Sequence, residues 1–195
     1  MKKITIVSLL IFIFFLIASN GLAIISFPGY SILSNTTSHL GAQGSPYSWI
    51  MNIFFISLGL MAILVTYSTR IRYHQVVGAV FGLSLILTGV FPHAPLVDSV
   101  PVNHLQDQIH SLSATSTGFS FTLLAAGHGF ISTGPQRIAG IVMAIVAVII
   151  SIAMGIFPAI TGLLQRVMFV GAFGWLFFCM KPPRNRQLNG KFDFD

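Results

Sequence analysis

Long apolar segments constrain the fold of this chain more than any other feature of its sequence. A helix needs roughly 20 apolar residues to cross the hydrocarbon core of a bilayer. Only 7% of the 195 residues are charged, which is too few to cover a soluble domain of this size. We therefore predict one all-α integral membrane domain over residues 1–195, a polytopic bundle of six transmembrane helices. The six predicted spans are residues 4–27, 48–67, 76–91, 105–131, 138–157 and 160–180.

The first segment fits two interpretations. Met1-Lys2-Lys3, the apolar run that follows and the small residues at 19–23 resemble a secretory signal peptide with its cleavage region. However, apolar character resumes over residues 22–27 and brings the segment to the length of a span. We therefore expect an uncleaved transmembrane helix.

The positive charges predict the orientation of the helices. With six spans, nine of the ten Lys and Arg residues fall on one side of the membrane, which the positive-inside rule assigns to the cytoplasm. Both termini, including the tail 181–195, are then cytoplasmic, in a cell (plasma or inner) membrane. Because topology accounts for the net charge of +6, we expect no nucleic-acid partner. The nine residues are Lys2, Lys3, Arg70, Arg72, Arg137, Lys181, Arg184, Arg186 and Lys191.

The fourth span begins with a polar stretch unlike the rest of the chain. Asn103 is a suitable N-cap, with Gln106 placed to complete a capping box. His104, Asp107 and His110 follow at steps of three, which predicts that they share one helix face. The run of Ser and Thr at 111–120 is typical of a helix surrounded by others, with hydroxyls that bond across helices.

Most of the ionisable residues outside the basic loops gather on the outward side. They lie in the first outer loop, 28–47, in the second, 92–103, and at the outer ends of the fourth and sixth spans, which predicts an outward-facing polar pocket. Arg166 is expected to pair with Asp98 or Asp107, or to hold an anionic lipid headgroup with Gln165 and Asn52 beside it. A structural ion pair or a snorkelling arginine is the competing interpretation.

The outward residues allow hydrolytic chemistry. His93, His104, His110 and Asp107 have the ligand types that suit zinc with an open position for water. Ser34, Ser38 or Ser45 is a candidate nucleophile, with His39 or His110 as its base. The competing interpretation is that each histidine is an interfacial residue bonded to water and loop carbonyls. The single cysteine, Cys179, supports neither a disulfide framework nor a cysteine-based metal site.

Two further functions fit the sequence less well. Antiparallel helices would match His93 with His110 and His74 with His128, as in a bis-histidine haem protein. These pairs are separated by about 27 Å along the helices, at the two bilayer edges, which disfavours haem. A polar path past Asn52 would suit a small transporter, but the paired broken helices of many transporters are missing from the sequence.

Short ordered motifs give the chain a family resemblance. They are Pro28-Gly29-Tyr30-Ser31, Ser38-His39-Leu40-Gly41, Ser45-Pro46 before a helix with Asn52 and Gly59, Gly89-Val90-Phe91-Pro92, His110, Gly162, Gln165-Arg166 and Trp175. From about residue 28 to 180 the sequence resembles the uncharacterised membrane family called domain of unknown function 998. The resemblance implies six spans with these motifs toward one face, and it implies no activity. The family often has an acid directly after the Phe-Pro step, where this chain has His93.

The hypothesis that unites these features is an enzyme that acts on a membrane lipid. It would be a hydrolase or transferase, with zinc as its candidate cofactor, membrane lipids as its partners and its site on the extracytoplasmic side. The alternative is a non-catalytic lipid-binding or accessory protein whose polar cluster serves packing and headgroup contact. The sequence makes no prediction of oligomeric state.

Overall fold

The computed structural model describes residues 2–181, and all regular secondary structure in this range is helical. The predicted all-α membrane bundle is therefore confirmed. The elements are α1 (Lys2–Ile24), α2 (Thr37–Leu40), α3 (Ser48–Ser68), α4 (Arg72–Val90), α5 (His104–Ile131), α6 (Gly134–Ile156), the 3₁₀ turn η1 (Pro158–Ile160), α7 (Thr161–Gly174) and the π-helical turn η2 (Trp175–Cys179). The predicted cytoplasmic tail lies outside the described residues, apart from Lys181.

Within residues 2–181, five helical segments are long and apolar enough to cross a membrane. The remaining predicted span is α5, which has 28 residues but carries too many polar side chains to qualify by composition. It packs between α4 and α6, so it runs alongside helices that do qualify. A sixth crossing by α5 stays a prediction. The five segments are Lys3–Ile24, Ser48–Ser68, Arg72–Val90, Gly134–Ile156 and Pro158–Cys179.

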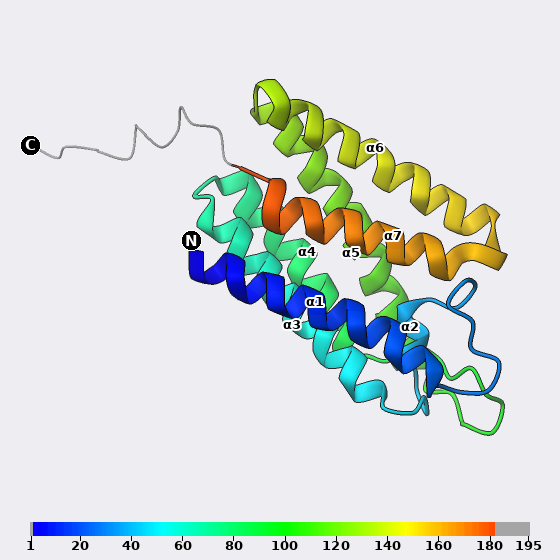
Figure 1. Ribbon diagram of the computed structural model, residues 1–195. Helices are drawn as coiled ribbons and strands as arrows, with labels where there is room; N and C mark the ends of the chain where they lie inside the picture. The colour runs from blue at the N-terminus through cyan, green and yellow to red at the C-terminus, as the bar shows by residue number, and fades with distance from the viewer. Residues whose placement is uncertain (1, 182–195) are drawn as a thin grey trace, which may run out of the picture.

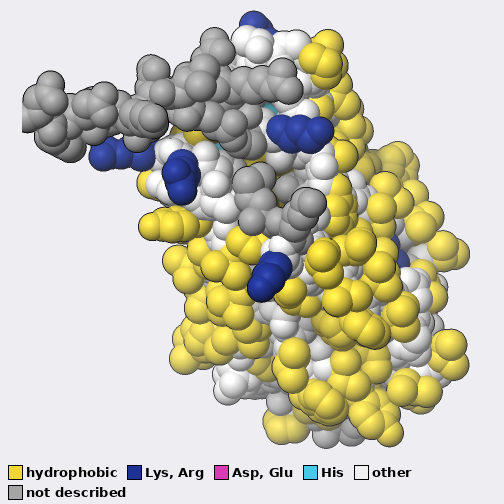
Figure 2. All heavy atoms as spheres, turned by 60° about the vertical axis from the view of Figure 1, so that its left-hand side comes forward, with side chains coloured by type: hydrophobic (Ala, Val, Ile, Leu, Met, Phe, Trp, Pro, Cys, Tyr) yellow, Lys and Arg dark blue, Asp and Glu magenta, His cyan; other side chains and the backbone are white. Residues whose placement is uncertain are grey.

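The long helices run up and down the bundle and define two ends (Figure 1). The start of α1, the α3–α4 and α5–α6 connections and the end of η2 lie at one end, which we call the charged end. Its Lys and Arg side chains are visible in Figure 2, bordered by hydrophobic surface. The two outer loops and η1 lie at the opposite end, which we call the loop end (Figure 1). The grouping agrees with the predicted topology, while the compartment that each end faces stays a prediction.

Glycines bring α3 and α4 into close contact. A Cβ atom added at Gly59 would lie 2.5 Å from the carbonyl oxygen of Gly82, and a Cβ at Gly82 would lie 2.5 Å from that of Gly59. Gly78 likewise faces Thr66 of α3, where a side chain would collide with the threonine hydroxyl. Small residues permit such approach between membrane helices. The crossing holds α4 in place against α3.

Helix α5 is buried on one side only, and this corrects the expectation that it is surrounded. Its outer face carries Leu112 and Phe119, each 70% exposed. The prediction that its hydroxyls bond across helices is also wrong for Thr115, Thr117, Ser120 and Thr122, because these donate to carbonyls three or four residues earlier in the same helix. Examples are Thr115 to the Ser111 oxygen at 2.8 Å and Thr117 to the Ser113 oxygen at 2.9 Å.

Candidate functional site

Arg166 of α7 anchors the first outer loop to the bundle. Its side chain is 9% exposed, and its two terminal nitrogens donate to four backbone carbonyls and one hydroxyl. The predicted ion pair with Asp98 or Asp107 does not form, and Arg166 makes no ion pair among residues 2–181. The acceptors are the oxygens of Ile32 (3.1 Å), Asn35 (2.9 Å), Gly162 (3.0 Å) and Ser19 (3.1 Å) and the Tyr30 hydroxyl (2.8 Å).

This arrangement places the guanidinium in a cage of peptide dipoles. A buried charge is costly unless hydrogen bonds compensate for lost water, and here carbonyl oxygens supply most of that compensation. Burial raises the pKa of the Tyr30 hydroxyl, although the bond from Arg166 opposes the shift, so Tyr30 stays neutral. The cage holds loop residues 30–35 against α1 and α7, which positions the short helix α2 that follows.

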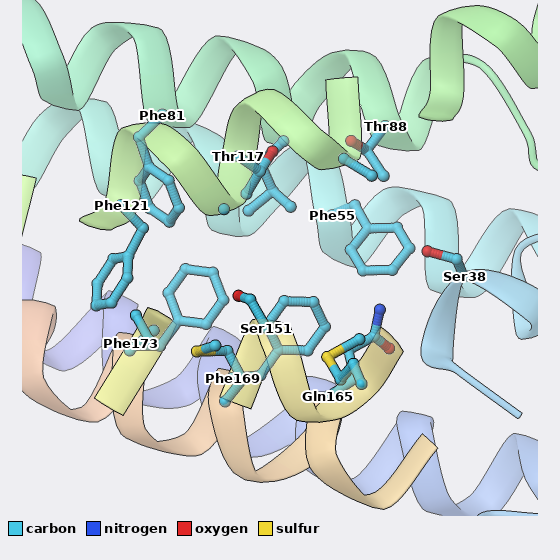
Figure 3. Close-up of a pocket in the computed structure, with 17 residues that line it drawn as sticks. Ser38, Phe55, Phe81, Thr88, Thr117, Phe121, Ser151, Gln165, Phe169 and Phe173 are labelled. Carbon is cyan, nitrogen blue, oxygen red and sulfur yellow. The ribbon is translucent and has the colours of Figure 1, made fainter. Parts of the chain in front are cut away.

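Gln165, the residue before Arg166, holds helix α2 in place. Both the amide and the hydroxyl of Thr37 donate to Oε1 of Gln165, at 2.7 and 2.8 Å. Since only the carbonyl oxygen of an amide side chain accepts, these two bonds set the orientation of the Gln165 amide. Its nitrogen then points into a cavity inside the bundle, where the Ser38 hydroxyl of α2 also points (Figure 3).

The cavity has a volume of about 160 Å³ and lies among α3, α4, α5, α6 and α7. Its walls are mainly aromatic and aliphatic, while hydroxyl and amide groups sit toward the loop end (Figure 3). It reaches the surface between α5 and α6, because Gly118 and Ser151 line it and are also exposed. The polar lining residues are Ser38, Thr88, Thr117, Ser151 and Gln165, and the aromatic ones are Phe55, Phe81, Phe121, Phe169 and Phe173.

Three histidines form a row beside the polar end of the cavity. The ring centroids of His39 and His93 are 5.1 Å apart, and those of His93 and His110 are 5.4 Å apart. We call these three residues the histidine row. It joins both outer loops to α5, and Thr88 connects it to the cavity, since Thr88 lines the cavity and its carbonyl accepts from His110.

The hydrogen bonds of His110 determine its tautomer. Nδ1 lies 2.8 Å from the Phe91 oxygen and 3.0 Å from the Thr88 oxygen. Carbonyl oxygens only accept, so Nδ1 carries the hydrogen and Nε2 of the neutral ring keeps a lone pair. That nitrogen is available as a base or a metal ligand.

His39 has the opposite tautomer. The Ser31 amide donates to Oδ1 of Asn35 at 2.8 Å, which directs Nδ2 of Asn35 at Nδ1 of His39, 3.0 Å away. Nδ1 therefore accepts and Nε2 carries the hydrogen. Burial lowers the pKa of His39 to about 4, and repulsion from the His93 and His110 rings and from Arg166 adds to the shift. His39 is thus a neutral donor at pH 7.

His104, Asp107 and His110, the polar residues at the start of α5, do not all lie together. Asp107 accepts from the Ala94 amide at 2.8 Å and lies 4.0 Å from Nδ1 of His93, whereas His104 is exposed. The expectation of a shared face is wrong for His104, because six helical residues rotate a side chain by about 120° away from its starting direction. Asn103 does cap α5, accepting from the Gln106 amide at 3.2 Å.

Gln43 makes the contact that joins the two outer loops. Its backbone amide donates to the His93 oxygen at 2.9 Å. Its side-chain oxygen accepts from the backbone amide of Asn103 at 2.8 Å, and its side-chain nitrogen donates to the Asn103 oxygen at 3.1 Å. The Asn103 amide is therefore bonded to Gln43, and the Gln106 side chain does not complete the predicted capping box. Sequence reasoning missed this contact, because a glutamine in a loop carries no signal of its partner.

The remaining predicted site residues serve different parts of the structure. Asn52 of α3 donates to the Gly41 oxygen at 3.1 Å and does not line the cavity, so it supports the loop after α2. Within residues 2–181, no three His, Cys, Asp or Glu side chains are grouped so that they could hold a metal ion. A zinc site on His93, His104, His110 and Asp107 stays a prediction.

A second histidine pair lies at the charged end. His74 and His128 are fully buried, with ring centroids 5.2 Å apart and Nε2 of His74 3.3 Å from Nδ1 of His128. The expected matching of His74 with His128 and of His93 with His110 is therefore confirmed. Rings in direct hydrogen-bond contact leave no room for a haem between His74 and His128.

A bundle of apolar helices with short connecting loops defines a polytopic helical membrane protein. The chain belongs to the family described as Protein of unknown function (DUF998), which matches residues 6–180. The resemblance seen in the loop and helix motifs is therefore confirmed over most of the chain. No curated protein and no solved structure matches it.

Proposed function

We propose that this protein binds a membrane lipid, with the apolar chain of the lipid in the cavity. The observation that carries the proposal is a cavity with aromatic walls that opens sideways between α5 and α6, at Gly118 and Ser151. Ligand sites are typically concave and mostly apolar, with a few polar groups that fix orientation. The Ser38 and Gln165 groups fill that role at the loop end of this cavity (Figure 3).

The surroundings of the opening favour a ligand from the bilayer over one from water. Phe119 beside it is 70% exposed, and Ile149 and Ile152 of α6 are 59% and 57% exposed. In a membrane these side chains contact lipid chains, so a molecule that enters between α5 and α6 comes from the hydrocarbon region. We place the polar end of the site toward the extracytoplasmic side, on the positive-inside argument.

A matched pair of glycine substitutions tests the proposal. A Cβ added at Gly118 or at Gly155 meets no atom within 4 Å, but only Gly118 lines the cavity. We expect Gly118→Leu to obstruct the opening and reduce lipid that copurifies with the protein at least tenfold, while Gly155→Leu leaves it unchanged. Mass spectrometry of lipid extracted from protein purified in a mild detergent gives the measurement. Equal lipid content in the two variants would count against the proposal.

A lipid-directed hydrolase or transferase is the second candidate. It is favoured by the position of His110, whose Nε2 lone pair belongs to a ring bonded to the cavity residue Thr88. In this function Nε2 of His110 has one of two roles. It takes the proton of the Ser38 nucleophile as general base, or it binds zinc together with the other histidines, and the zinc would supply activated water. His110→Ala should then abolish ester cleavage without loss of lipid binding. If the parent protein binds stoichiometric zinc, the His110→Ala variant should have lost it. Lipid binding with no turnover by the parent protein would leave only the first function.

A further inference from the structure

We infer that the polar group of the ligand is an uncharged hydrogen-bond acceptor, such as the carbonyl of an acyl ester. This inference rests on the proposed function, because it assigns the ligand class of the same cavity. It follows from the chemistry of the polar lining and from the absence of charge on it.

The side chain of Gln165 supplies a donor at the polar end. Its oxygen already accepts from both donors of Thr37, at 2.7 and 2.8 Å, so the amide cannot turn over without losing two bonds. Its nitrogen makes no hydrogen bond within residues 2–181 and points into the cavity (Figure 3). A ligand that fills the cavity would cover this nitrogen, and a ligand without an acceptor atom would leave it unsatisfied.

The cavity walls exclude a charged group. Among residues 2–181, no Lys, Arg, Asp or Glu lines the cavity. Arg166 follows Gln165 directly in α7 but bonds to carbonyls and a tyrosine hydroxyl from α1, the first outer loop and α7. An anion moved from water to such a site would lose its hydration without gaining a counter-ion. A carboxylate or phosphate therefore fits poorly, whereas an ester carbonyl matches the amide donor.

The distribution of polar and aromatic residues along the cavity sets the orientation of the ligand. Ser38, Thr88 and Gln165 are at one end, and Phe121 and Phe173 are at the other (Figure 3). An acyl ester would place its carbonyl at the amide and its chain among the phenylalanines. The class is thus a neutral lipid with an ester near the end of an apolar chain.

Trp175 provides a reporter for the test. It is 4% exposed, and its ring lies 5.9 Å from that of Phe121, which lines the cavity. The other tryptophan, Trp49, is 62% exposed and is removed as Trp49→Phe. Full-length protein in detergent is titrated with three chain-brominated probes of equal length: a methyl ester, an alkyl sulfonate and a hydrocarbon without a polar end. Quenching of Trp175 fluorescence measures their binding.

We expect the ester to quench saturably and to bind at least tenfold more tightly than either other probe. Gln165→Glu keeps an oxygen for Thr37 but replaces the donor with a second acceptor, so it should weaken ester binding at least tenfold. Gln108→Glu is the matched control, because Gln108 is exposed on α5 and away from the cavity. Circular dichroism and size-exclusion profiles establish that each variant is folded.

The outcomes separate this inference from the proposed function. If the sulfonate or the hydrocarbon binds as tightly as the ester, the ligand class is wrong although the cavity binds lipid. The same holds if Gln165→Glu binds the ester as the parent does. The comparison of probes uses only the Trp49→Phe protein, so it remains decisive if Gln165→Glu fails to fold. If no probe quenches Trp175, the proposed function itself is wrong.

Discussion

Arg166 is the residue on which the loop end depends most. Its guanidinium bonds to residues more than 130 positions before it in the chain. These are Ser19 of α1 and Asn35 of the first outer loop. A planar group with five donors can bridge several carbonyls at once, which the compact ammonium of lysine cannot do. The arginine therefore acts in this structure as a clamp that positions α2, and through it Ser38 and His39.

A conservative substitution of the clamp should be costly. Arg166→Lys keeps the charge but cannot reach all five acceptors, so buried carbonyls lose partners. We expect the free energy of unfolding to fall by about 2 kcal/mol. For a chain of this size this corresponds to a thermal midpoint lower by roughly 4–8 °C. Arg137→Lys is the control, because Arg137 is exposed. Equal midpoints for the two variants would contradict the clamp.

The histidine row should make stability depend on pH. The pKa of His39 is near 4 in the folded protein and near 6.5 when unfolded, so between these values the unfolded chain binds more protons. The contribution of neutral His39 to the free energy of unfolding is therefore complete above pH 6.5 and is lost as the pH falls toward 4. Because His39 is partly exposed, we expect the effect to be about 1–2 kcal/mol.

His39→Asn isolates this effect, since the asparagine oxygen can accept the bond from Asn35 without titrating. The thermal midpoint of the parent should fall more between pH 7 and pH 4.5 than that of the variant. The other histidines are common to both proteins and cancel in the difference. Parallel pH profiles would show that His39 is not the titrating group.

At the scale of elements, the helices are positioned by two kinds of contact. Helices α3 and α4 meet backbone to backbone at Gly59 and Gly82, whereas α5 and α6 separate far enough at Gly118 and Ser151 to leave an opening. The crossing and the opening lie on different pairs of helices, so each can be changed by its own substitutions.

The crossing should not tolerate added atoms. Gly59→Ala and Gly82→Ala each place a methyl group 2.5 Å from a facing carbonyl oxygen, and overpacking of this kind costs about 1–3 kcal/mol. Gly155→Ala is the control, because its methyl group meets nothing within 4 Å and alanine favours a helix over glycine. Thermal unfolding should show lower midpoints for the first two variants alone. A midpoint at or above that of the parent would refute the close contact.

At the scale of the whole molecule, the two ends differ in charge. The charged end carries Arg70, Arg72, Arg137 and Lys181, and the loop end has its only described cation, Arg166, buried. Such asymmetry orients a membrane protein during insertion. We therefore expect the charged end in the cytoplasm and the loop end outside.

Cysteine labelling tests the orientation. In a Cys179→Ala background, Ser99→Cys lies at the loop end and Thr133→Cys at the charged end, and both positions are exposed. A membrane-impermeant maleimide should label Ser99→Cys in intact cells and Thr133→Cys only after permeabilisation. The reverse pattern would show that the protein is inserted the other way.

Local sequence patterns were enough to predict the helices, the two ends of the bundle and the approximate depth of the paired histidines. Hydropathy over about 20 residues and the positions of Lys and Arg are local properties, and they act through the bilayer on each segment separately. Helix rise then matched His93 with His110 and His74 with His128, since the separation from His74 to His93 is nearly equal to that from His110 to His128 and the two segments are antiparallel. The family motifs required no more than the order of the residues.

Which polar groups meet, and where the cavity lies, depends on how the helices and loops pack in three dimensions. Arg166 carries a charge that predicted a carboxylate partner, yet the loop folded over it so that backbone oxygens from three segments accept from its two terminal nitrogens. The cavity likewise arose from helices far apart in the chain, where Gly118 and Ser151 leave space between α5 and α6. The physical reason is that a side chain bonds to whatever the surrounding segments bring within about 3 Å, and those segments are placed by packing of the whole bundle.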